Sequence, residues 1–145
     1  MTTFTVTVPA TTANIGPGFD CLGAALTLYN QFTFTLLPAT TANPVSIIVK
    51  GTESAKVSQG ADNLIYTSFL QVYQKIGQNP PPIAIEIGLG VPLARGLGSS
   101  ATAIIGGLLA ANQCAGNPLS MGEIEALAIA LRSEEHTSEL QSPCN

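Results

Sequence analysis

The stretch IAIEIGLGVPLARGLGSSATAIIGGLL, residues 83–109, decides the fold. Residues 83–87 are typical of a strand, and a glycine-rich loop at 88–98 follows them. From Ser99 onward the residues are apolar on nearly every side of a helix, so this helix is expected to be buried. The sequence therefore predicts a strand, a loop and a buried helix in direct succession.

Three further strands are predicted upstream of this stretch. Residues 4–8 alternate with a period of two, and Pro9 is expected to end that strand. Residues 24–37 are rich in Thr, Phe, Tyr and Leu, which favour strands, and residues 45–49 form a short apolar run.

Two further helices complete the predicted set. Asp62 is the expected N-cap of a helix with apolar residues at spacings of three and four, and Gly77 closes it. Ser120 and Glu123 form the expected capping box of a helix that ends at Leu131. The predicted fold class is α+β, with helices packed on one face of a mostly antiparallel or mixed sheet.

Composition excludes several function classes. The chain has 145 residues, enough for one domain or part of a larger one, and nine acidic against five basic side chains give a net charge of −4. That balance disfavours nucleic acid as a partner, and no apolar run reaches the roughly 20 residues that span a membrane. Three distant cysteines and no secretory leader pattern favour a reducing, cytoplasmic setting.

The loop and first helical turn at 92–102 have the chemistry of a phosphate-binding site. Two glycines in three residues let the backbone approach a ligand closely, and a helix N-terminus offers unpaired N–H groups to an anion. Three hydroxyls in the first turn can reach phosphate oxygens or a magnesium ion. Arg95 is the one formal positive charge between Lys75 and Arg132. The alternative is a turn, capped by Ser99, that only joins strand to helix.

Two better-known phosphate loops do not fit. The motif Gly-x-x-x-x-Gly-Lys-Ser/Thr is absent, because no lysine precedes Ser99. The spacing Gly96-x-Gly98-x-x-Ala101 matches a dinucleotide pattern, but that pattern needs a strand running straight into its first glycine. The predicted strand ends near Ile87, so we reject a Rossmann interpretation.

The loop at 9–20 is a second candidate site. Its Gly-Pro-Gly turn is flanked by Asn14 and Asp20, and Asp20 and Lys50 are the only charged side chains in the first fifty residues. A carboxylate in such apolar surroundings needs a partner, which a substrate ammonium would supply. The alternative is that Asn14 and Asp20 satisfy backbone amides within the turn.

Together these loops resemble a known family. The segment TVPATTANIGPGFDCLG, residues 7–23, resembles the N-terminal signature of homoserine kinases. Residues 92–102 resemble the ATP loop of the wider galactokinase, homoserine kinase, mevalonate kinase and phosphomevalonate kinase (GHMP) superfamily, and DNLIY at 62–66 resembles a family segment near the nucleotide. The resemblance covers about residues 4–131.

The resemblance implies an enzyme that phosphorylates the side-chain hydroxyl of L-homoserine with ATP and Mg²⁺, on the route to threonine. It implies an N-terminal domain like domain 2 of ribosomal protein S5, a ferredoxin-like C-terminal domain, and a homodimer at full length. Asn14 and Asp20 would bind L-homoserine, with Asp20 on its ammonium, and Ser100 would lie near the metal. No residue is assigned as a catalytic base. The residues implied to bind ATP are Pro92, Leu93, Ala94, Arg95, Gly96, Leu97, Gly98, Ser99, Ser100, Ala101, Thr102 and Asn63.

The resemblance stops near Leu131. The family continues with Glu-Gly-His-Pro-Asp-Asn, whose glutamate is expected to bind Mg²⁺, whereas this chain continues with RSEEHT. We therefore expect an ATP-binding domain at 1–131, truncated before the C-terminal domain, and a disordered or artefactual tail at 132–145 that lies outside the family. The full-length parent would be the kinase, and this chain would have little or no activity.

Other functions remain open from sequence. One is another GHMP kinase, such as a mevalonate or isoprenoid-precursor kinase, whose substrates lack an ammonium. A second is a nucleotide-binding module without catalytic activity. An RNA-binding role like that of protein S5 shares the fold class, but the acidic charge disfavours it.

Overall fold

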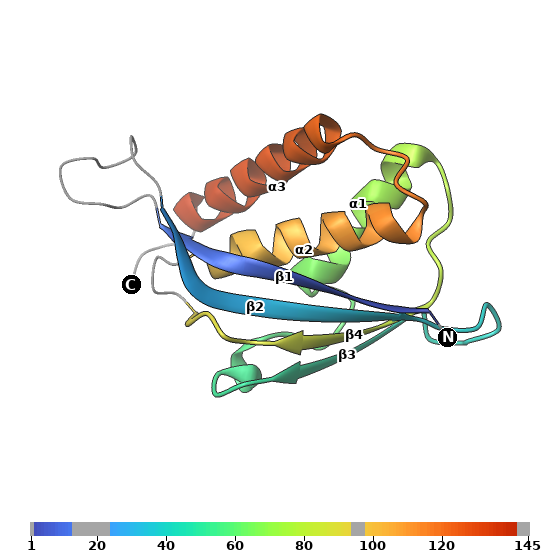
Figure 1. The fold of residues 1–145 in the computed structure, drawn as a ribbon, viewed down its shortest axis with the longest axis horizontal. Coiled ribbons are helices and arrows are strands. Elements are labelled where there is room, and N and C mark those ends of the chain that lie inside the picture. The colour runs from blue at the N-terminus through green and yellow to red at the C-terminus, as the bar shows by residue number, and fades with distance from the viewer. Residues whose placement is uncertain (1, 13–23, 94–97, 142–145) are drawn as a thin grey trace.

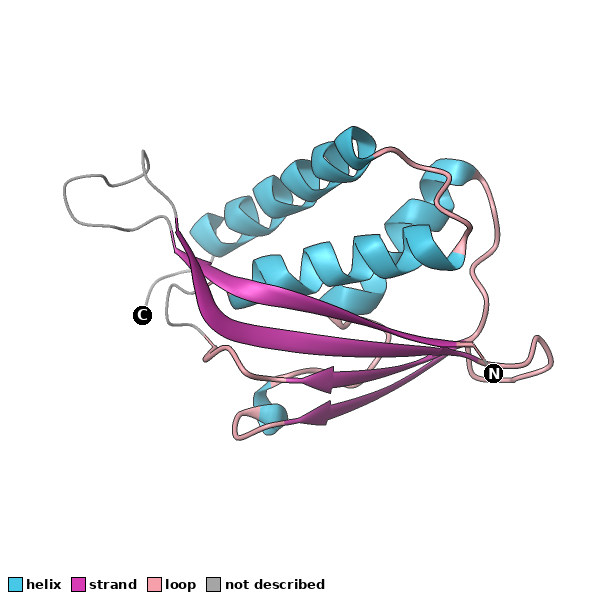
Figure 2. Ribbon diagram, viewed as in Figure 1, coloured by secondary structure: helices cyan, strands magenta, loops and turns pink. Residues whose placement is uncertain are grey.

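A mixed four-stranded sheet forms one layer of the protein, and helices lie over one of its faces (Figures 1 and 2). The computed structural model describes residues 2–12, 24–93 and 98–141, with side chains as far as residue 134. The strands are β1 (Thr3–Thr12), β2 (Ala24–Leu36), β3 (Val45–Lys50) and β4 (Ile83–Gly88), in the order β1-β2-β4-β3. Only β3 and β4 pair in parallel. The predicted α+β class is confirmed.

The edge strand β1 runs further than the sequence predicts. It continues past Pro9 to Thr12, so the prediction that Pro9 ends it is wrong. The pairing of β1 with β2 shifts register between Pro9 and Thr11, and β1 has a neighbour on one side only. A proline without an N–H is tolerated at an edge and at a bulge, which explains why the strand continues.

The helix α1 (Leu64–Ile76) connects β3 to β4 and packs on the sheet. Phe69 of α1 stacks on Phe34 of β2, with ring centroids 6.0 Å apart. The N-cap is Asn63, one residue later than predicted: its Oδ1 accepts the N–H of Ile65 at 2.9 Å. Gly77 closes the helix in the left-handed conformation, as predicted.

The helix α2 (Ser99–Cys114) begins where the sequence predicts and is largely buried. It crosses α1 at very close range near Gly107, where an added Cβ would lie 2.9 Å from Cβ of Ser68. A glycine is needed at this crossing, and the close packing fixes the direction of α2 relative to the sheet.

The helix α3 (Met121–Gln141) packs against α2. Its capping box is confirmed, because the N–H of Ser120 donates to Glu123 Oε1 and the N–H of Glu123 donates to Ser120 Oγ, both at 3.2 Å. The predicted end at Leu131 is wrong, since the helical backbone continues to Gln141. Residues 132–141 contain neither proline nor glycine, so nothing in the sequence stops the helix there. The division of the chain at residue 131 stays a prediction.

Within the part of the chain that the structure describes, no helix is long and apolar enough to cross a membrane.

Candidate phosphate-binding site

The candidate site lies at one end of the sheet, on the left in Figure 1, where β4 ends and α2 begins. A pocket of about 230 Å³ opens there. Its walls come from β2, β4, the first turn of α2, the start of α1, and the short 3-10 helix η2 (Ser54–Lys56) with the residues after it. Segments far apart in the sequence therefore enclose one space.

The N-terminus of α2 has no side-chain cap among the described residues. Gly98 is its N-cap residue, with φ +71°. The first bond within the helix runs from the N–H of Thr102 to the carbonyl of Gly98 at 3.0 Å, which leaves the preceding N–H groups of the turn without a helical partner. These groups and the helix dipole favour an anion at this position.

Gly98 also fixes where α2 meets the sheet. A Cβ at this position would lie 2.6 Å from Thr11 Oγ1 and 3.2 Å from the carbonyl oxygen of Thr11. The last residues of β1 therefore lie directly against the start of α2. Both the positive φ and this contact require glycine.

The predicted ATP-binding residues do not all face the pocket. Leu93, Ser99 and Ser100 line it. Pro92 lies beside a smaller cavity, and Ala101 lines an apolar groove between α2 and α3. Four of the predicted residues lie outside the described part of the chain: Ala94, Arg95, Gly96 and Leu97.

The hydroxyl of Thr102 is turned into the protein. Thr102 is 1% exposed, and its Oγ1 donates to the carbonyl of Ser99 at 2.6 Å while accepting from Asn30 at 2.8 Å. This hydroxyl holds the first turn of α2 in place. Ser99 and Ser100 are the hydroxyl-bearing residues of the turn that line the pocket.

Asn63 lines the pocket, but its amide is already occupied. Besides capping α1, it donates through Nδ2 to the carbonyl of Ser58 at 2.6 Å. Asn63 is 5% exposed. The structure thus gives Asn63 a structural role, and its contact with adenine stays a prediction.

Asn30 is a site residue that the sequence interpretation missed. This side chain of β2 is 1% exposed and forms hydrogen bonds with residues on both sides of the 92–98 segment. The signal available in the sequence was a single asparagine inside the apolar, strand-forming run at 24–37. Its partners lie 60 to 72 residues away, so sequence spacing alone does not reveal them.

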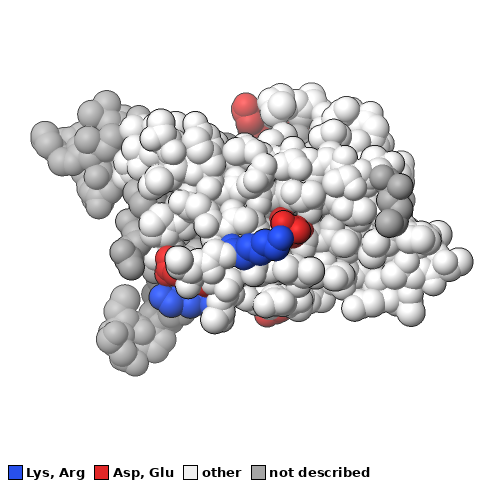
Figure 3. All heavy atoms as spheres, turned by 60° about the horizontal axis from the view of Figure 1, so that its bottom comes forward, with Lys and Arg blue, Asp and Glu red and all other residues white. Residues whose placement is uncertain are grey.

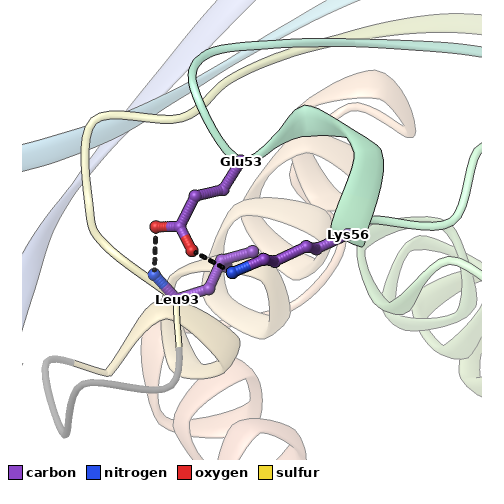
Figure 4. Close-up of polar contacts among 3 residues, drawn as sticks. All are labelled: Glu53, Lys56 and Leu93. Carbon is purple, nitrogen blue, oxygen red and sulfur yellow. Dashed lines mark hydrogen bonds and ion pairs between the residues drawn. The ribbon is translucent and has the colours of Figure 1, made fainter.

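The sequence interpretation also missed Glu53 and Lys56, and Figure 4 shows Glu53 between Lys56 and the loop residue Leu93. Glu53 Oε1 accepts the N–H of Leu93 at 3.1 Å, and Glu53 Oε2 lies 3.1 Å from Lys56 Nζ. Lys56 also lines the pocket, where it places a positive charge. For Lys56, the signal available in the sequence was an isolated lysine in a chain with five basic residues.

Charged side chains are sparse elsewhere. On the face shown in Figure 3, the basic side chains in view lie beside acidic ones, in agreement with the pairs Lys50–Glu86 and Lys56–Glu53.

In the core, burial raises the pKa of Tyr73, and its hydrogen bond to Cys114 raises this pKa further. Burial also raises the pKa of Tyr66. Both phenols therefore stay neutral at physiological pH.

Asn14 and Asp20 lie outside the described residues, within 13–23. The residues on either side of that segment are described: Thr12 of β1 pairs with Ala24 of β2. Because Thr11 lies against Gly98, the segment joins the sheet beside the N-terminus of α2.

A magnesium site is only partly provided by the described residues. They contain no group of three or more His, Cys, Asp or Glu side chains that could hold a metal. Mg²⁺ bound to a nucleotide needs only one or two protein oxygens besides phosphate and water. Ser100, which lines the pocket and carries a hydroxyl, fits the role of one such ligand.

Comparison with known proteins gives a consistent result. The N-terminal domain of GHMP kinases matches residues 63–142. Homoserine kinases of Crocosphaera subtropica and Trichodesmium erythraeum are 64% and 60% identical to the chain over 131 residues, which is 90% of the chain and 42% of each relative. The chain thus spans about two fifths of the length of these curated relatives.

Solved structures agree with this comparison. The homoserine kinase of Cytophaga hutchinsonii superposes with a TM-score of 0.75 at 29% identity, over 89% of the chain and 40% of that structure. A mevalonate kinase of Methanococcus jannaschii has a TM-score of 0.72 at 16% identity, over 92% of the chain and 47% of that structure. At that identity the second likeness concerns the fold alone.

Proposed function

The chain belongs to the GHMP kinases through its N-terminal domain, and we propose that it is the nucleotide-binding part of a homoserine kinase. The reaction proposed for the protein at the length of its relatives is transfer of the γ-phosphoryl group of ATP to the side-chain hydroxyl of L-homoserine. The observation that carries the proposal is the uncapped N-terminus of α2 beside the 230 Å³ pocket. The names of relatives about 60% identical to the chain support the choice of substrate.

ATP binding would use the pocket and the helix end together. Apolar wall residues, such as Phe32 and Leu64, suit a purine, and the N–H groups before Thr102 suit the negatively charged phosphates. Lys56 adds a cation on the pocket wall. Charge that develops on the phosphates in the transition state is stabilised by the same N–H groups, because they are already oriented.

In the proposed transfer, the substrate hydroxyl oxygen attacks the γ-phosphorus and the bond from that phosphorus to the β,γ-bridging oxygen breaks. The products are O-phospho-L-homoserine and ADP, and the hydroxyl proton passes to a phosphate oxygen or to water. Phosphoryl transfer depends mainly on positioning and on charge stabilisation, so a chain with one histidine can support it. Bound Mg²⁺ would neutralise phosphate charge, with Ser100 as a protein ligand.

Substrate binding would use the 13–23 segment. The carboxylate of Asp20 would bind the ammonium of L-homoserine, and Asn14 would hydrogen-bond the amino acid. The position of Thr11 against Gly98 supports this assignment, since the segment begins two residues after Thr11. The homodimer and the cytoplasmic location of the full-length protein remain part of the proposal.

ADP release with L-homoserine tests the proposal, using the chain extended to the length of its homoserine kinase relatives. We expect release to depend on L-homoserine and not on mevalonate. Asp20→Asn should raise the KM for L-homoserine by about tenfold or more, because a hydrogen bond between charged groups is lost, while the KM for ATP stays unchanged. Glu86→Gln, on the outer face of the sheet, is the matched control and should change neither constant.

Turnover with mevalonate but not L-homoserine would identify another kinase of the superfamily. ATP binding without turnover on any hydroxyl substrate would favour a binding module. The 145-residue chain alone should release little ADP, and appreciable homoserine-dependent release by it would contradict that expectation.

A further inference from the structure

The side chain of Asn30 forms hydrogen bonds at both ends of the 92–98 segment. On the incoming side, its Oδ1 accepts the N–H groups of Gly90 and Val91, each at 2.9 Å. On the outgoing side, its Nδ2 donates to Thr102 Oγ1 at 2.8 Å and to Ser99 Oγ at 3.4 Å. A single amide thus connects the end of β4 to the start of α2.

These bonds are made in a buried place. Asn30 is 1% exposed, and an amide buried without partners is strongly unfavourable, so all of its bonds are expected to persist in the folded state. Glu53 also holds Leu93 on the incoming side, at 3.1 Å. Asn30 is therefore placed to set the spacing across the loop.

We propose that Asn30 is a positioning residue for phosphate binding. Its amide holds both ends of the 92–98 segment and orients the first turn of α2, so that the N–H groups there point at the phosphates. The inference rests on the proposed nucleotide site. Asn30 belongs to the wall of that pocket but is 1% exposed, and the role assigned to it acts through the loop ends it holds. It implies that loss of the amide weakens binding of the phosphates and spares binding of the base.

The experiment measures dissociation constants of the 145-residue chain for Mg–ATP and for adenosine by calorimetry. Measurements are made at a temperature where circular dichroism shows each variant to be folded. Asn30→Ala should weaken ATP binding by about tenfold, the effect of one or two hydrogen bonds, and change adenosine binding by less than about twofold. Thr102→Val removes the hydroxyl's bonds to Asn30 and to the Ser99 carbonyl, and it leaves the bonds of Asn30 to Gly90 and Val91 in place. It should shift ATP binding in the same direction by a smaller factor.

Asn112 supplies a matched control at the other end of α2. It is also buried, at 7% exposure, and its amide donates to the carbonyl of Leu119 at 3.0 Å and accepts the N–H of Leu119 at 2.9 Å. Asn112→Ala and Asn30→Ala should both lower the melting temperature, but Asn112→Ala should leave ATP binding unchanged. A general loss of stability would affect both variants alike, whereas positioning affects only Asn30.

Hydrogen exchange adds a readout that does not depend on nucleotide. In Thr102→Val, which is the milder change, amide exchange should rise in a peptide that covers residues 98–102 and stay unchanged at 112–119.

The inference is overturned if folded Asn30→Ala and Thr102→Val bind ATP as the unaltered chain does. Equal losses for ATP and adenosine, or an equal loss of ATP binding in Asn112→Ala, would also overturn it. Failure of the unaltered chain to bind ATP would instead refute the proposed site itself, together with this inference. The measurement on the unaltered chain therefore distinguishes failure of the Asn30 inference from failure of the proposed nucleotide site.

Discussion

Replacing Gly98 by alanine is expected to reduce both the free energy of unfolding and the affinity for ATP. Gly98 has φ +71° and ψ +31°, a conformation that costs an L-residue about 1–2 kcal/mol. The added Cβ would also lie 2.6 Å from Thr11 Oγ1, which is closer than carbon and oxygen normally approach. Overpacking of this kind costs about 1–3 kcal/mol, so the two effects together give a loss of about 2–5 kcal/mol.

Gly77 is an unusually close control for this substitution. It has φ +71° and ψ +29° at the end of α1, and an added Cβ there has nothing within 4 Å. Gly77→Ala should therefore show the backbone cost alone, about 1–2 kcal/mol. The difference between the two variants measures the contact with Thr11.

Urea denaturation followed by circular dichroism gives both free energies, and calorimetry gives the affinities for Mg–ATP. Gly77→Ala should bind ATP as the unaltered chain does, whereas Gly98→Ala should bind it more weakly because the first turn of α2 must move away from β1. Adding Thr11→Ala to Gly98→Ala should recover part of the lost stability. Equal destabilisation by Gly77→Ala and Gly98→Ala, or full ATP affinity in Gly98→Ala, would refute the reasoning.

Two further predictions concern charge. Lys56→Met should weaken ATP binding several-fold, and the difference from the unaltered chain should shrink as salt is added, because Lys56 lines the pocket and is exposed to solvent. Lys50→Met removes a similarly exposed lysine, also paired with a glutamate at 3.1 Å, and should leave calorimetric ATP affinity unchanged at every salt concentration. The contribution of Tyr73 to the free energy of unfolding should be level up to a pH of about 10 and then fall, because unfolded tyrosine ionises near its ordinary pKa of 10.0 whereas burial raises the pKa of folded Tyr73. Urea titrations at pH 8–11 should show a shallower fall in Tyr73→Phe, and an unchanged fall would contradict this assignment.

The sequence predicts well what depends on local patterns. The start of α2 at Ser99 follows from a glycine-rich loop before an apolar helix, and the capping box of Ser120 and Glu123 is a contact across three residues. One of its errors occurred where tertiary structure overrides local preference. Pro9 does not end β1, because that strand lies at the edge of the sheet and the pairing shifts beside it.

The missed site residues have a different cause. Asn30 and Glu53 reach the loop across 60 and 40 residues, respectively, in their bonds to Gly90 and Leu93. Nothing in their immediate neighbours indicates these contacts, because strand pairing and the position of η2 create them. Conversely, the hydroxyl of Thr102 has the right sequence position for phosphate binding, but the helix turns it toward Asn30.

The charge of the chain explains why so many contacts hold the loop. With five basic against nine acidic residues, and with Lys56 already paired to Glu53, the described side chains supply little positive charge for a nucleotide, and Arg95 lies outside the described residues. Affinity for phosphate must then come largely from backbone N–H groups, whose contribution falls steeply when their direction or distance changes. A site of this kind requires a rigid frame more than additional lysines. That frame is supplied by Asn30, Glu53 and the contact of Gly98 with Thr11. Substitutions in it should therefore weaken ATP binding as effectively as removal of a positive charge.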